Sequence, residues 1–548
     1  MNTAVDGVGD GASPAGRAGL ARSSVVVAAG TFSSRVTGLL RVIVLAAVLG
    51  EGLLGDTYNL ANTTPNILYE LVLGGVLAAT LVPVFVERIE HDDDRAVSAI
   101  FTVSLTVLLG FTVVVTACAP LVAHFIVLFT EPAKRAAQLH TLTVFLVCFV
   151  PQIVFYGFTA LASALLNARR RFVAAAFAPV VNNLAVIAIL LAFAHYVSSR
   201  RGAIASATSV HLSDGSLLLL GIGTTAGIVL MAAVLAGAML HAGVRIRAVL
   251  AWGEPAIRTI IRLSGWTLGY VVANQLAQIF VIILANRGTT GRVSAYVYAF
   301  TFYQMPHGLL AVSIMTTIGP ELARRATARD MPGYMRDLRL GLRYIVALVL
   351  PASVLFVVLA QPMLGIIVQG KFTVHDAAVT GDTLQVFALS LVPFSVYLFT
   401  MRGFYSLQDT RTPFFVNLLE NVLNIAFALA LCWRFGVQGL ALAWGIAYLI
   451  SSGVAFRALG RRVGAIADTA VRRGAAKAGV AALALAGVAA PIAGAIGHDS
   501  PGQALAATVV AGTAGVVAYV AVLAALRADE LRSLVDLVRR RGTSRPRV

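Results

Sequence analysis

The segment from Ser216 to Ala242 reads SLLLLGIGTTAGIVLMAAVLAGAMLHA and contains no acidic, lysine or arginine side chain. A helix of this length extends about 40 Å, which is enough to cross the roughly 30 Å hydrocarbon core of a bilayer. Similar apolar runs recur along the chain of 548 residues, which is 58% hydrophobic and only 12% charged. Soluble domains carry about twice that charged fraction. The sequence therefore predicts an all-α polytopic membrane protein.

About fourteen transmembrane helices can be assigned in this way. Short polar loops separate them, and an even number of crossings puts both termini on one side of the membrane. The predicted spans are 24–50, 57–86, 97–129, 138–166, 172–197, 216–242, 257–286, 293–320, 340–360, 380–407, 412–433, 437–456, 474–495 and 503–526.

A weak internal repeat indicates that the first twelve spans form two halves. Residues 165–170 (LLNARR) resemble residues 406–411 (SLQDTR), and the same offset of 241 residues relates Asn183 to Asn424. Parallel repeats of this kind are related by an axis along the membrane normal. We predict a disordered cytoplasmic tail (1–23), an N-terminal six-helix lobe (24–242), a C-terminal six-helix lobe (257–457), two appended transmembrane helices (474–526) and a basic cytoplasmic tail (527–548).

Lysine and arginine side chains are concentrated on one side of the predicted membrane. Of the 42 in the chain, 31 fall in the tails and alternate loops on the side of the termini, and 8 fall in the opposite loops. The positive-inside rule therefore predicts that both termini of this multi-pass membrane protein are cytoplasmic. The net charge of +17 thus reflects orientation in a membrane, and no nucleic-acid partner is expected.

The sequence shows no enzyme constellation. It has no Walker A loop, and its nine histidines show no metal-ligand spacing. Transport driven by ATP hydrolysis in this chain is excluded. Energy would come from an ion gradient such as sodium, from the membrane potential or from the substrate's own concentration difference.

Charged residues inside the first span are the best candidates for a binding site. Arg35 and Arg41 both lie within residues 24–50, where a charge costs at least a few kcal/mol unless it has a partner or an aqueous cavity. Snorkelling to an interface is the alternative, but helix rise puts the two residues about 15 and 24 Å from the start of the span. We therefore predict that both line a broad cavity.

Three acidic residues in or beside the predicted spans are also candidates for functional roles. Glu70 lies at a depth similar to that of Arg35, which suggests an ion pair between them. Glu420 and Arg402 share a depth in the same manner, and a structural salt bridge is the alternative to a functional role. Asp56 begins the second span, where it either caps that helix or has a functional role.

At these positions the sequence resembles the MurJ/MviN family of lipid II flippases, within the multidrug/oligosaccharidyl-lipid/polysaccharide exporter superfamily. The resemblance covers roughly residues 20 to 530. It is carried by Ser34-Arg35-Val36-x-Gly38-x-x-Arg41, Asp56, Pro65-Asn66, Leu165-x-Asn167-x-x-x-Arg171-Phe172, Ala178-Pro179, Pro306-x-Gly308, Gly370-Lys371-Phe372-Thr373 and Gly403-Phe404-Tyr405-Ser406-x-Gln408-Asp409-x-x-Thr412-Pro413.

The resemblance implies two lobes around a V-shaped cationic cavity that works by alternating access. It implies lipid II in the bilayer as substrate, with cell-wall synthesis and division proteins as further candidate partners. Arg35, Arg41 and Asp56 match positions important for function in the family. The predicted substrate-binding residues are Arg35, Arg41, Asp56, Glu70 and Arg402.

The chain departs from the family pattern at several charged positions. Where other members carry cavity charges, this sequence has Val42, Tyr69, Gly74, Thr301 and Gln304. Some relatives bind a sodium ion between the seventh and twelfth helices. Asn424 is the inherited ligand that this resemblance implies here.

Two other classes of function are weighed against a flippase. A cation-coupled exporter of drugs or metabolites from the same superfamily would need buried carboxylates or aromatic cages to bind organic cations. A non-transporting scaffold for the division machinery has no need for charges inside the membrane. Buried arginines favour an anionic lipid headgroup over both alternatives.

Overall fold

The computed structural model describes residues 14–70, 82–91, 93–128, 130–199, 213–255, 265–287 and 289–531. Every regular element in these ranges is helical. The sequence favours this architecture because only helices and closed barrels satisfy all backbone polar groups within a bilayer. The prediction of an all-α membrane fold is thereby confirmed.

The helices of the N-terminal part pack mainly on one another. The first, α1, lies along α8, while α9 contacts α6, α7 and α8. These helices are α1 (Pro14–Leu49), α2 (Leu53–Tyr69), α3 (Val82–Glu90), α4 (Asp94–Ala117), α5 (Ala119–Ile126), α6 (Pro132–Phe149), α7 (Gln152–Ala168), α8 (Phe172–Ser199) and α9 (Asp214–His241).

The remaining helices form a second group. In it, α11 packs on α17, α14 on α15, and α18 and α19 pack on each other and on α14. These elements are α11 (Gly265–Ala285), α12 (Arg292–Pro306), the π-helical turn η3 (His307–Ala311), α13 (Val312–Thr327), α14 (Met331–Gly365), α15 (Val374–Ala388), α16 (Leu391–Ser406), α17 (Arg411–Val463), α18 (Thr469–Ile496) and α19 (Pro501–Ala525).

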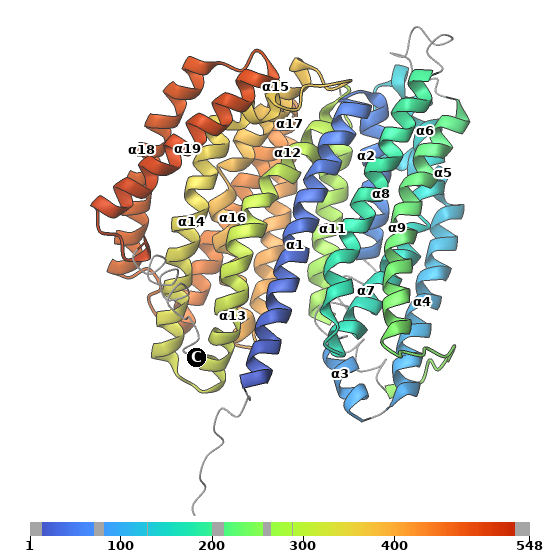
Figure 1. The fold of residues 1–548 in the computed structure, drawn as a ribbon, viewed down its shortest axis with the longest axis horizontal. Helices are drawn as coiled ribbons and strands as arrows, with labels where there is room; N and C mark the ends of the chain where they lie inside the picture. Colours follow the sequence, from blue (N-terminus) through green and yellow to red (C-terminus); the bar gives the residue numbers. More distant parts are fainter. Residues whose placement is uncertain are drawn as a thin grey trace, which may run out of the picture.

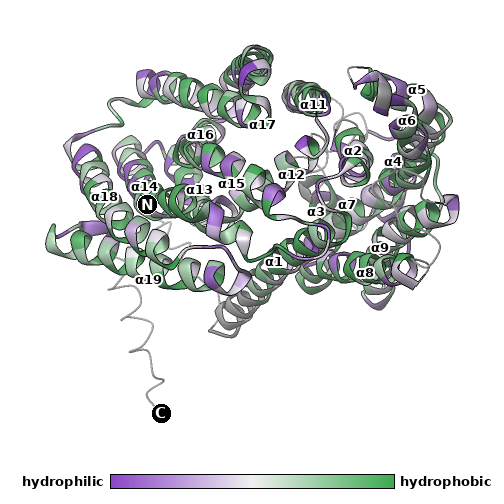
Figure 2. Ribbon diagram, turned by 90° about the horizontal axis from the view of Figure 1, so that it is seen from above, coloured by the Kyte–Doolittle hydropathy of each residue, from purple (hydrophilic) through white to green (hydrophobic). Residues whose placement is uncertain are grey.

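The two groups lie side by side with their helices roughly parallel (Figure 1). Helices α2 to α9 lie on one side, α13 to α19 on the other, and α1, α11 and α12 lie between them (Figure 1). Hydrophobic residues predominate along the helices of both groups when the bundle is viewed from above (Figure 2). The division of the chain into two six-helix lobes at 242 and 257 stays a prediction.

Within the described residues, ten helices are long and apolar enough to cross a bilayer, and α15 and α16, bent by 47°, would add an eleventh. The predicted number of fourteen therefore stays a prediction. Predicted span 57–86 corresponds to α2 and α3, with residues 71–81 outside the described ranges, and 293–320 is divided among α12, η3 and α13. Spans 412–433 and 437–456 are both in α17, where Gly436 interrupts the helical backbone.

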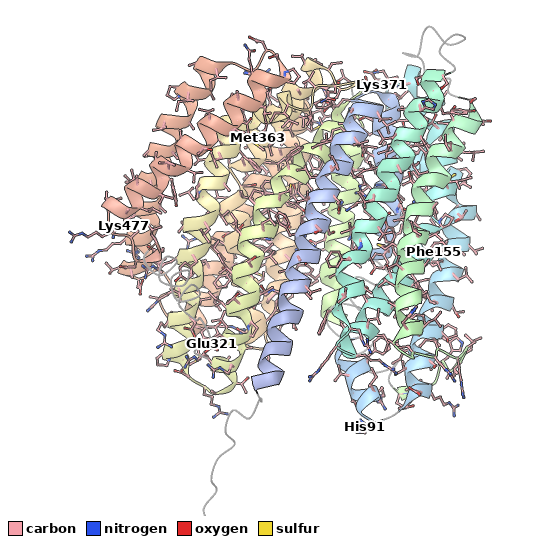
Figure 3. The ribbon with its side chains drawn as sticks, in the orientation of Figure 1. His91, Phe155, Glu321, Met363, Lys371 and Lys477 are labelled. Carbon is pink, nitrogen blue, oxygen red and sulfur yellow. The ribbon has the colours of Figure 1, made fainter. Side chains whose placement is uncertain are left out.

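The two ends of the bundle carry different groups. Helix α1 begins at the end that carries His91 and Glu321, and Lys371 lies at the opposite end (Figure 3). Near the C-terminus, Glu530 forms an ion pair with Arg343, in the N-terminal half of α14. Both ends of the described chain thus lie at the same end of the bundle. The opposite end, which carries residues 50–52 and Lys371, is called the distal face below.

Candidate functional site

A cavity of about 400 Å³ lies between α1, α8 and α12. It contains Arg35 and Arg41, so the structure brings the two predicted cavity arginines onto one wall. Arg35 is exposed and Arg41 is half-buried, so both guanidinium groups can be hydrated. The lining residues are Thr31, Ser34, Arg35, Gly38, Leu39, Arg41, Val42, Ala175, Ala176, Pro179, Phe300, Thr301, Gln304 and Met305.

Two contacts hold this part of α1 in position. The side-chain amide of Asn183 on α8 donates to the carbonyl of Ser34 at 3.2 Å and to the Thr37 hydroxyl at 3.1 Å. On the other side, the Arg35 guanidinium packs over Gly308 in η3, 3.4 Å from the place a Cβ would take. The Pro-x-Gly motif thus provides room for the arginine beside a local π-helical turn, a feature common at functional sites.

The uncharged substitutions noted in the sequence fall on the same cavity. Val42, Thr301 and Gln304 all line it. Tyr69 instead lies against Tyr156, with the ring centroids 5.7 Å apart, and Gly74 lies outside the described residues. Among the residues that line the cavity, Arg35 and Arg41 therefore carry all the formal charge.

Asp56 joins the two groups of helices near the distal face. It is 3% exposed, and its carboxylate accepts hydrogen bonds from the backbone N–H groups of Gly291 (2.6 Å) and Ser294 (2.9 Å) and from the Ser294 hydroxyl (2.8 Å). Gly291 and Ser294 are the N-cap and third residue of α12. The carboxylate thus caps α12, where the helix dipole favours negative charge. The alternative that Asp56 caps its own helix is wrong, because Gly52 holds the N-cap of α2.

Further contacts extend this junction, which we call the distal seam. The Lys371 backbone N–H donates to the carbonyl of Ala47 at 2.8 Å, and the Thr380 hydroxyl donates to the carboxyl of Glu51. The Asn59 amide donates to the Ser294 hydroxyl at 3.1 Å. The distal seam therefore consists of Ala47, Glu51, Asp56 and Asn59 on one side and Gly291, Ser294, Lys371 and Thr380 on the other.

Glu51 lies in the turn between α1 and α2, and its carboxyl group is held in an unusual protonation state. Burial raises its pKa to about 9, an effect that the Thr380 hydrogen bond opposes and that the charges of Asp376 and Asp56 reinforce. The carboxyl is thus protonated at neutral pH. This suits a contact between the two groups of helices, because a neutral group costs less to bury than a charged one.

The predicted ion pair between Arg35 and Glu70 is not formed among the described residues. Arg35 faces the cavity and Gly308, whereas Glu70 is exposed at the end of α2. Consecutive helices α1 and α2 make little contact, and α1 packs on α8 instead. Equal depth along two helices therefore did not imply that their side chains meet.

The predicted pair of Arg402 and Glu420 is also absent from the described part of the chain. Arg402 is exposed on α16, while Glu420 is 1% exposed on α17 and has a carboxylate oxygen without a hydrogen-bond partner. The two helices pack closely, but these residues occupy different faces. Neither Arg402 nor Glu70 lines the cavity of Arg35 and Arg41.

Asn424 lies one turn beyond Glu420 on the same helix. It is 4% exposed, and its side-chain oxygen has no partner among the described residues; the same holds for one oxygen each of Glu420 and Asn417. These residues are spaced by three, four and seven, so they share one face of α17. Unpartnered oxygen atoms of this kind suit a hard cation. The donor set thus fits the sodium ligand that the sequence suggested.

Several residues of the distal seam were not singled out from the sequence. Gly291 and Ser294 carry no unusual side-chain chemistry, and their role depends on a backbone N–H group that a partner reaches from 235 or more positions away. The sequence feature that could have indicated this contact was Gly291 itself. Gly291 has φ +98°, and a Cβ there would stand 2.7 Å from the carbonyl oxygen of Glu51.

Comparisons with known proteins agree with this arrangement. The family model described as "Lipid II flippase MurJ" matches residues 45–500. A "Probable lipid II flippase MurJ" of Rhizobium meliloti (strain 1021) is 28% identical over 450 residues, which cover 80% of each chain. The "Lipid II flippase MurJ" of Burkholderia cenocepacia is 29% identical over 452 residues, which cover 81% of this chain and 84% of that protein.

Solved structures show the same fold. The structure "Lipid II flippase MurJ, inward closed conformation" superposes with a TM-score of 0.73 at 19% identity, covering 93% of this chain and 100% of that one. An inward-facing multidrug resistance MATE family transporter of the MOP superfamily gives 0.64 at 13% identity, covering 79% and 95%. Because the family model spans most of the sequence, the chain belongs to the lipid II flippase MurJ family.

Proposed function

We propose that this protein transports lipid II from the cytoplasmic to the outer leaflet of the plasma membrane by alternating access. Membership of the family supports this function. The observation that carries it at the site is the cavity in which Arg35 and Arg41 line one wall. Lipid II is a polyprenyl pyrophosphate that bears a disaccharide-pentapeptide, and its pyrophosphate requires concentrated positive charge.

Arg35 and Arg41 would bind the pyrophosphate. Guanidinium groups donate paired hydrogen bonds to phosphate oxygens, and such charge-assisted bonds are about twice as strong as neutral ones. Thr301 and Gln304 on α12 would add neutral donors where other members carry charge. The missing charges would thus be replaced by polar contacts from the opposite wall.

The lipid tail would remain outside the cavity. Phe32, Val36 and Leu40 are spaced by four residues along α1, and their exposed fractions are 57%, 46% and 45%. This spacing puts them on one face of the helix, close to the arginines but directed outward. An apolar face of this kind suits contact with hydrocarbon.

The distal seam would form the outer gate. We place both termini in the cytoplasm, as the distribution of lysine and arginine suggests, so that the distal face is the outer one. A closed distal seam then leaves the substrate cavity accessible only from the inner side. Separation of Asp56 from α12 would accompany opening toward the outside. Glu70 and Arg402, which lie apart from the cavity in this conformation, would contact substrate in another state of the cycle.

A sodium ion would be held by Asn424 with Glu420 and Asn417. It would supply positive charge that offsets the buried carboxylate of Glu420, and so couple the transport cycle to an ion gradient. The measurement is the melting temperature of the purified protein in sodium chloride and in choline chloride, since a ligand that binds the folded state raises stability. Sodium should raise it in the wild type but not in Asn424→Ala; equal melting temperatures in both salts would exclude the ion.

Depletion of the protein in its own bacterium tests the proposed transport. Lipid II should accumulate on the cytoplasmic leaflet, as measured by its accessibility to a lipid II-cleaving enzyme added to right-side-out and inverted vesicles. Wild-type protein expressed from a plasmid should restore the outer pool. Continued wall synthesis with a normal distribution of lipid II after depletion would contradict the proposal. Unchanged export of organic cations under depletion would exclude the alternative of a drug exporter.

A further inference from the structure

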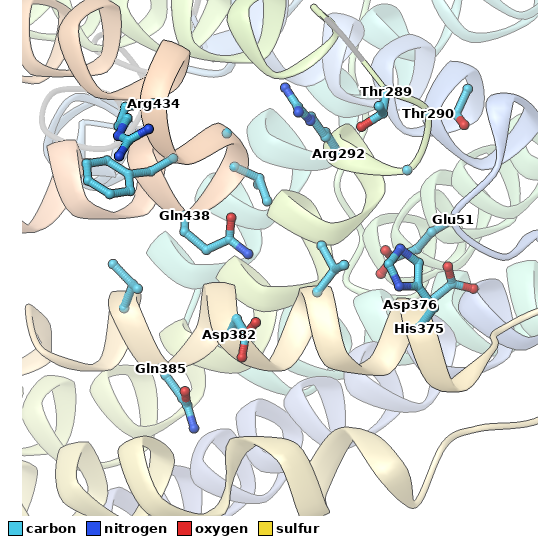
Figure 4. Close-up of a pocket in the computed structure, with 16 residues that line it drawn as sticks. Glu51, Thr289, Thr290, Arg292, His375, Asp376, Asp382, Gln385, Arg434 and Gln438 are labelled. Carbon is cyan, nitrogen blue, oxygen red and sulfur yellow. The ribbon is translucent and has the colours of Figure 1, made fainter.

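A second cavity, of about 690 Å³, is lined by Glu51 and so lies at the distal face. Figure 4 shows its lining residues. It is formed by the turn before α2, the turn before α12, helix α15 and the middle of α17. It is separate from the cavity of Arg35 and Arg41, with which it shares no lining residue. We call it the distal pocket.

The distal pocket is suited to a polar ligand. Ten of its sixteen lining residues have polar or charged side chains, whereas pockets for apolar ligands are lined mainly by hydrophobic groups. Its charges are of both signs. The polar residues are Glu51, Thr289, Thr290, Arg292, His375, Asp376, Asp382, Gln385, Arg434 and Gln438 (Figure 4).

The positive and negative side chains of the distal pocket come from different helices. Arg292 at the start of α12 and Arg434 on α17 lie across the pocket from Asp382 on α15 (Figure 4). Within the described residues neither arginine forms an ion pair, and the one side-chain bond recorded for Arg292 is to the carbonyl of Arg287 at 3.3 Å. Asp382 is exposed and accepts a bond from Gln361 at 2.7 Å. Charges on both sides of the pocket are therefore available to a ligand.

The distal pocket is also continuous with the distal seam. Gly291 lines the pocket while its backbone N–H is held by Asp56, and Glu51 lines it while bonded to Thr380. A headgroup that leaves between the two groups of helices must pass these residues. Opening of the seam would release the Gly291 N–H group and change the wall of the pocket.

We propose that the distal pocket binds the stem peptide of the transported headgroup on the outer side of the membrane. The carboxylates of the peptide would pair with Arg292 and Arg434, and its free amino group with Asp382 and Asp376. Pockets of roughly 300–1,000 Å³ enclose ligands of drug size, so this one holds a peptide but not the entire headgroup. The proposal rests on lipid II being the substrate.

The charge pattern disfavours the pyrophosphate as occupant. Two arginines alone would suit a pyrophosphate, but Asp376 and Asp382 would then stand near an anion of the same sign. Like charges that cannot separate oppose binding and act as a specificity device. A zwitterionic peptide satisfies both sides of the pocket, whereas a polyanion satisfies one.

The test compares two lipids bound to the purified full-length protein in nanodiscs. One is lipid II with its pentapeptide, and the other is the same polyprenyl-pyrophosphate disaccharide without the peptide. The pocket variants are Arg434→Gln and Asp382→Asn, both at exposed positions. Arg336→Gln and Asp94→Asn, whose side chains are 67% and 85% exposed far from the pocket, serve as matched controls.

We expect the wild type to bind the peptide-bearing lipid more tightly. Each pocket variant should weaken that binding by about tenfold, which corresponds to the loss of one charge-assisted hydrogen bond. Binding of the peptide-free lipid should be unchanged in all variants, and the controls should behave as wild type. Free pentapeptide should compete with the first lipid and not with the second.

Different results separate this inference from the proposed function. Equal affinity of the wild type for both lipids would overturn the inference and leave lipid transport standing. An equal loss of both lipids in Arg434→Gln would identify the pyrophosphate as occupant, which also overturns it. Failure of the wild type to bind either lipid would contradict the proposed function and the inference together.

Discussion

Two arginines give the central cavity its charge, and the sequence identified both. Arg35 and Arg41 stood out because a charge within an apolar span is costly, and the structure places both on the wall of one cavity. Their partners could not be predicted in the same way. A salt bridge depends on which faces two helices present to each other, and a one-dimensional estimate of depth does not contain that information.

The first prediction concerns these arginines. Arg35→Ala and Arg41→Ala should each abolish growth complementation, because loss of a charged hydrogen bond to phosphate weakens binding by roughly 10- to 100-fold. Expression in the membrane should remain normal, as measured by immunoblot. Arg336→Ala, at an exposed position, is the control. Wild-type growth of either cavity variant would remove that arginine from the site.

The second prediction concerns the pH dependence of Glu51. Its pKa is about 9 in the closed distal seam and would return toward 4.5 when the seam opens to water. The closed state therefore binds a proton that the open state releases, so closure weakens as pH rises from about 4.5 to 9. The groups around Glu51 are Thr380, Asp376, Asp56 and, in the same pocket, His375.

This dependence can be measured with spin labels on Glu131→Cys and Val374→Cys, at exposed positions on the two groups of helices. The population with a long distance should increase between pH 6 and pH 9 in the wild type. Glu51→Gln cannot lose a proton, so it should remove that part of the increase. The same increase in Glu51→Gln as in the wild type would assign the effect to another group.

At the scale of elements, the sequence located the helices better than their connections. Predicted spans 412–433 and 437–456 correspond to the two halves of α17, which meet at Gly436, where φ is +57° and the backbone is not helical. No loop marks the boundary.

The sequence repeat also has a structural counterpart with a different register. Arg170 and Gln408 both have positive φ directly after the C-cap of a helix, and Gln408 follows Arg170 by 238 residues instead of 241.

That shift changes which asparagine of the second half corresponds to Asn183. With the structural offset, Asn183 corresponds to Asn421. Both are tied to a neighbouring helix, Asn183 to α1 and Asn421 to Asn274 of α11 at 2.8 Å. Sequence similarity in a turn allows a slip of a few residues, while the hydrogen bonds of the turn fix the register.

The third prediction concerns the cap that Asp56 provides for α12. Asp56→Ala would leave the N–H groups of Gly291 and Ser294 without an acceptor in a buried place, at about 1–3 kcal/mol each. The closed seam should lose population, and the labels at positions 131 and 374 should report longer distances. Asp56→Asn retains one acceptor oxygen and should fall between the wild type and the alanine variant.

Glycine variants provide an independent check of the same cap. Gly291→Ala should open the distal seam, because its backbone is in the left-handed region and its Cβ would contact the carbonyl of Glu51. Gly319→Ala is the matched control, since a Cβ there meets nothing within 4 Å. Unchanged label distances in both Asp56→Ala and Gly291→Ala would show that the seam does not hold the molecule closed.

At the scale of the whole molecule, composition predicted the membrane fold correctly, and the family follows from motifs spread over nearly the entire chain. The distribution of basic residues predicted an orientation that geometry alone does not supply. Positions at the two ends of α18 provide a direct test. Arg472 is exposed in the first turn of α18, and Asp499 lies in the turn between α18 and α19.

The fourth prediction is therefore topological. In a background lacking Cys118, Cys148 and Cys432, a membrane-impermeant maleimide should label Asp499→Cys in intact cells. It should label Arg472→Cys only after the membrane is permeabilised, because the positive-inside rule puts that end of α18 in the cytoplasm. The reverse labelling pattern would show that the protein has the opposite orientation in the membrane, with the distal face on the cytoplasmic side.

The break at Gly436 has a mechanical consequence for the whole bundle. Each half of α17 is roughly 40 Å long by helix rise, so a change of about 10° at this residue would move the far ends by about 7 Å. At those ends, Arg462 is bound to Asp409 at 2.8 Å. The two halves of α17 therefore meet at Gly436, beside the distal pocket, and the ion pair between Arg462 and Asp409 connects their far ends. A ligand that changes the angle at Gly436 by a few degrees on one side of the membrane would separate Arg462 from Asp409 on the other side.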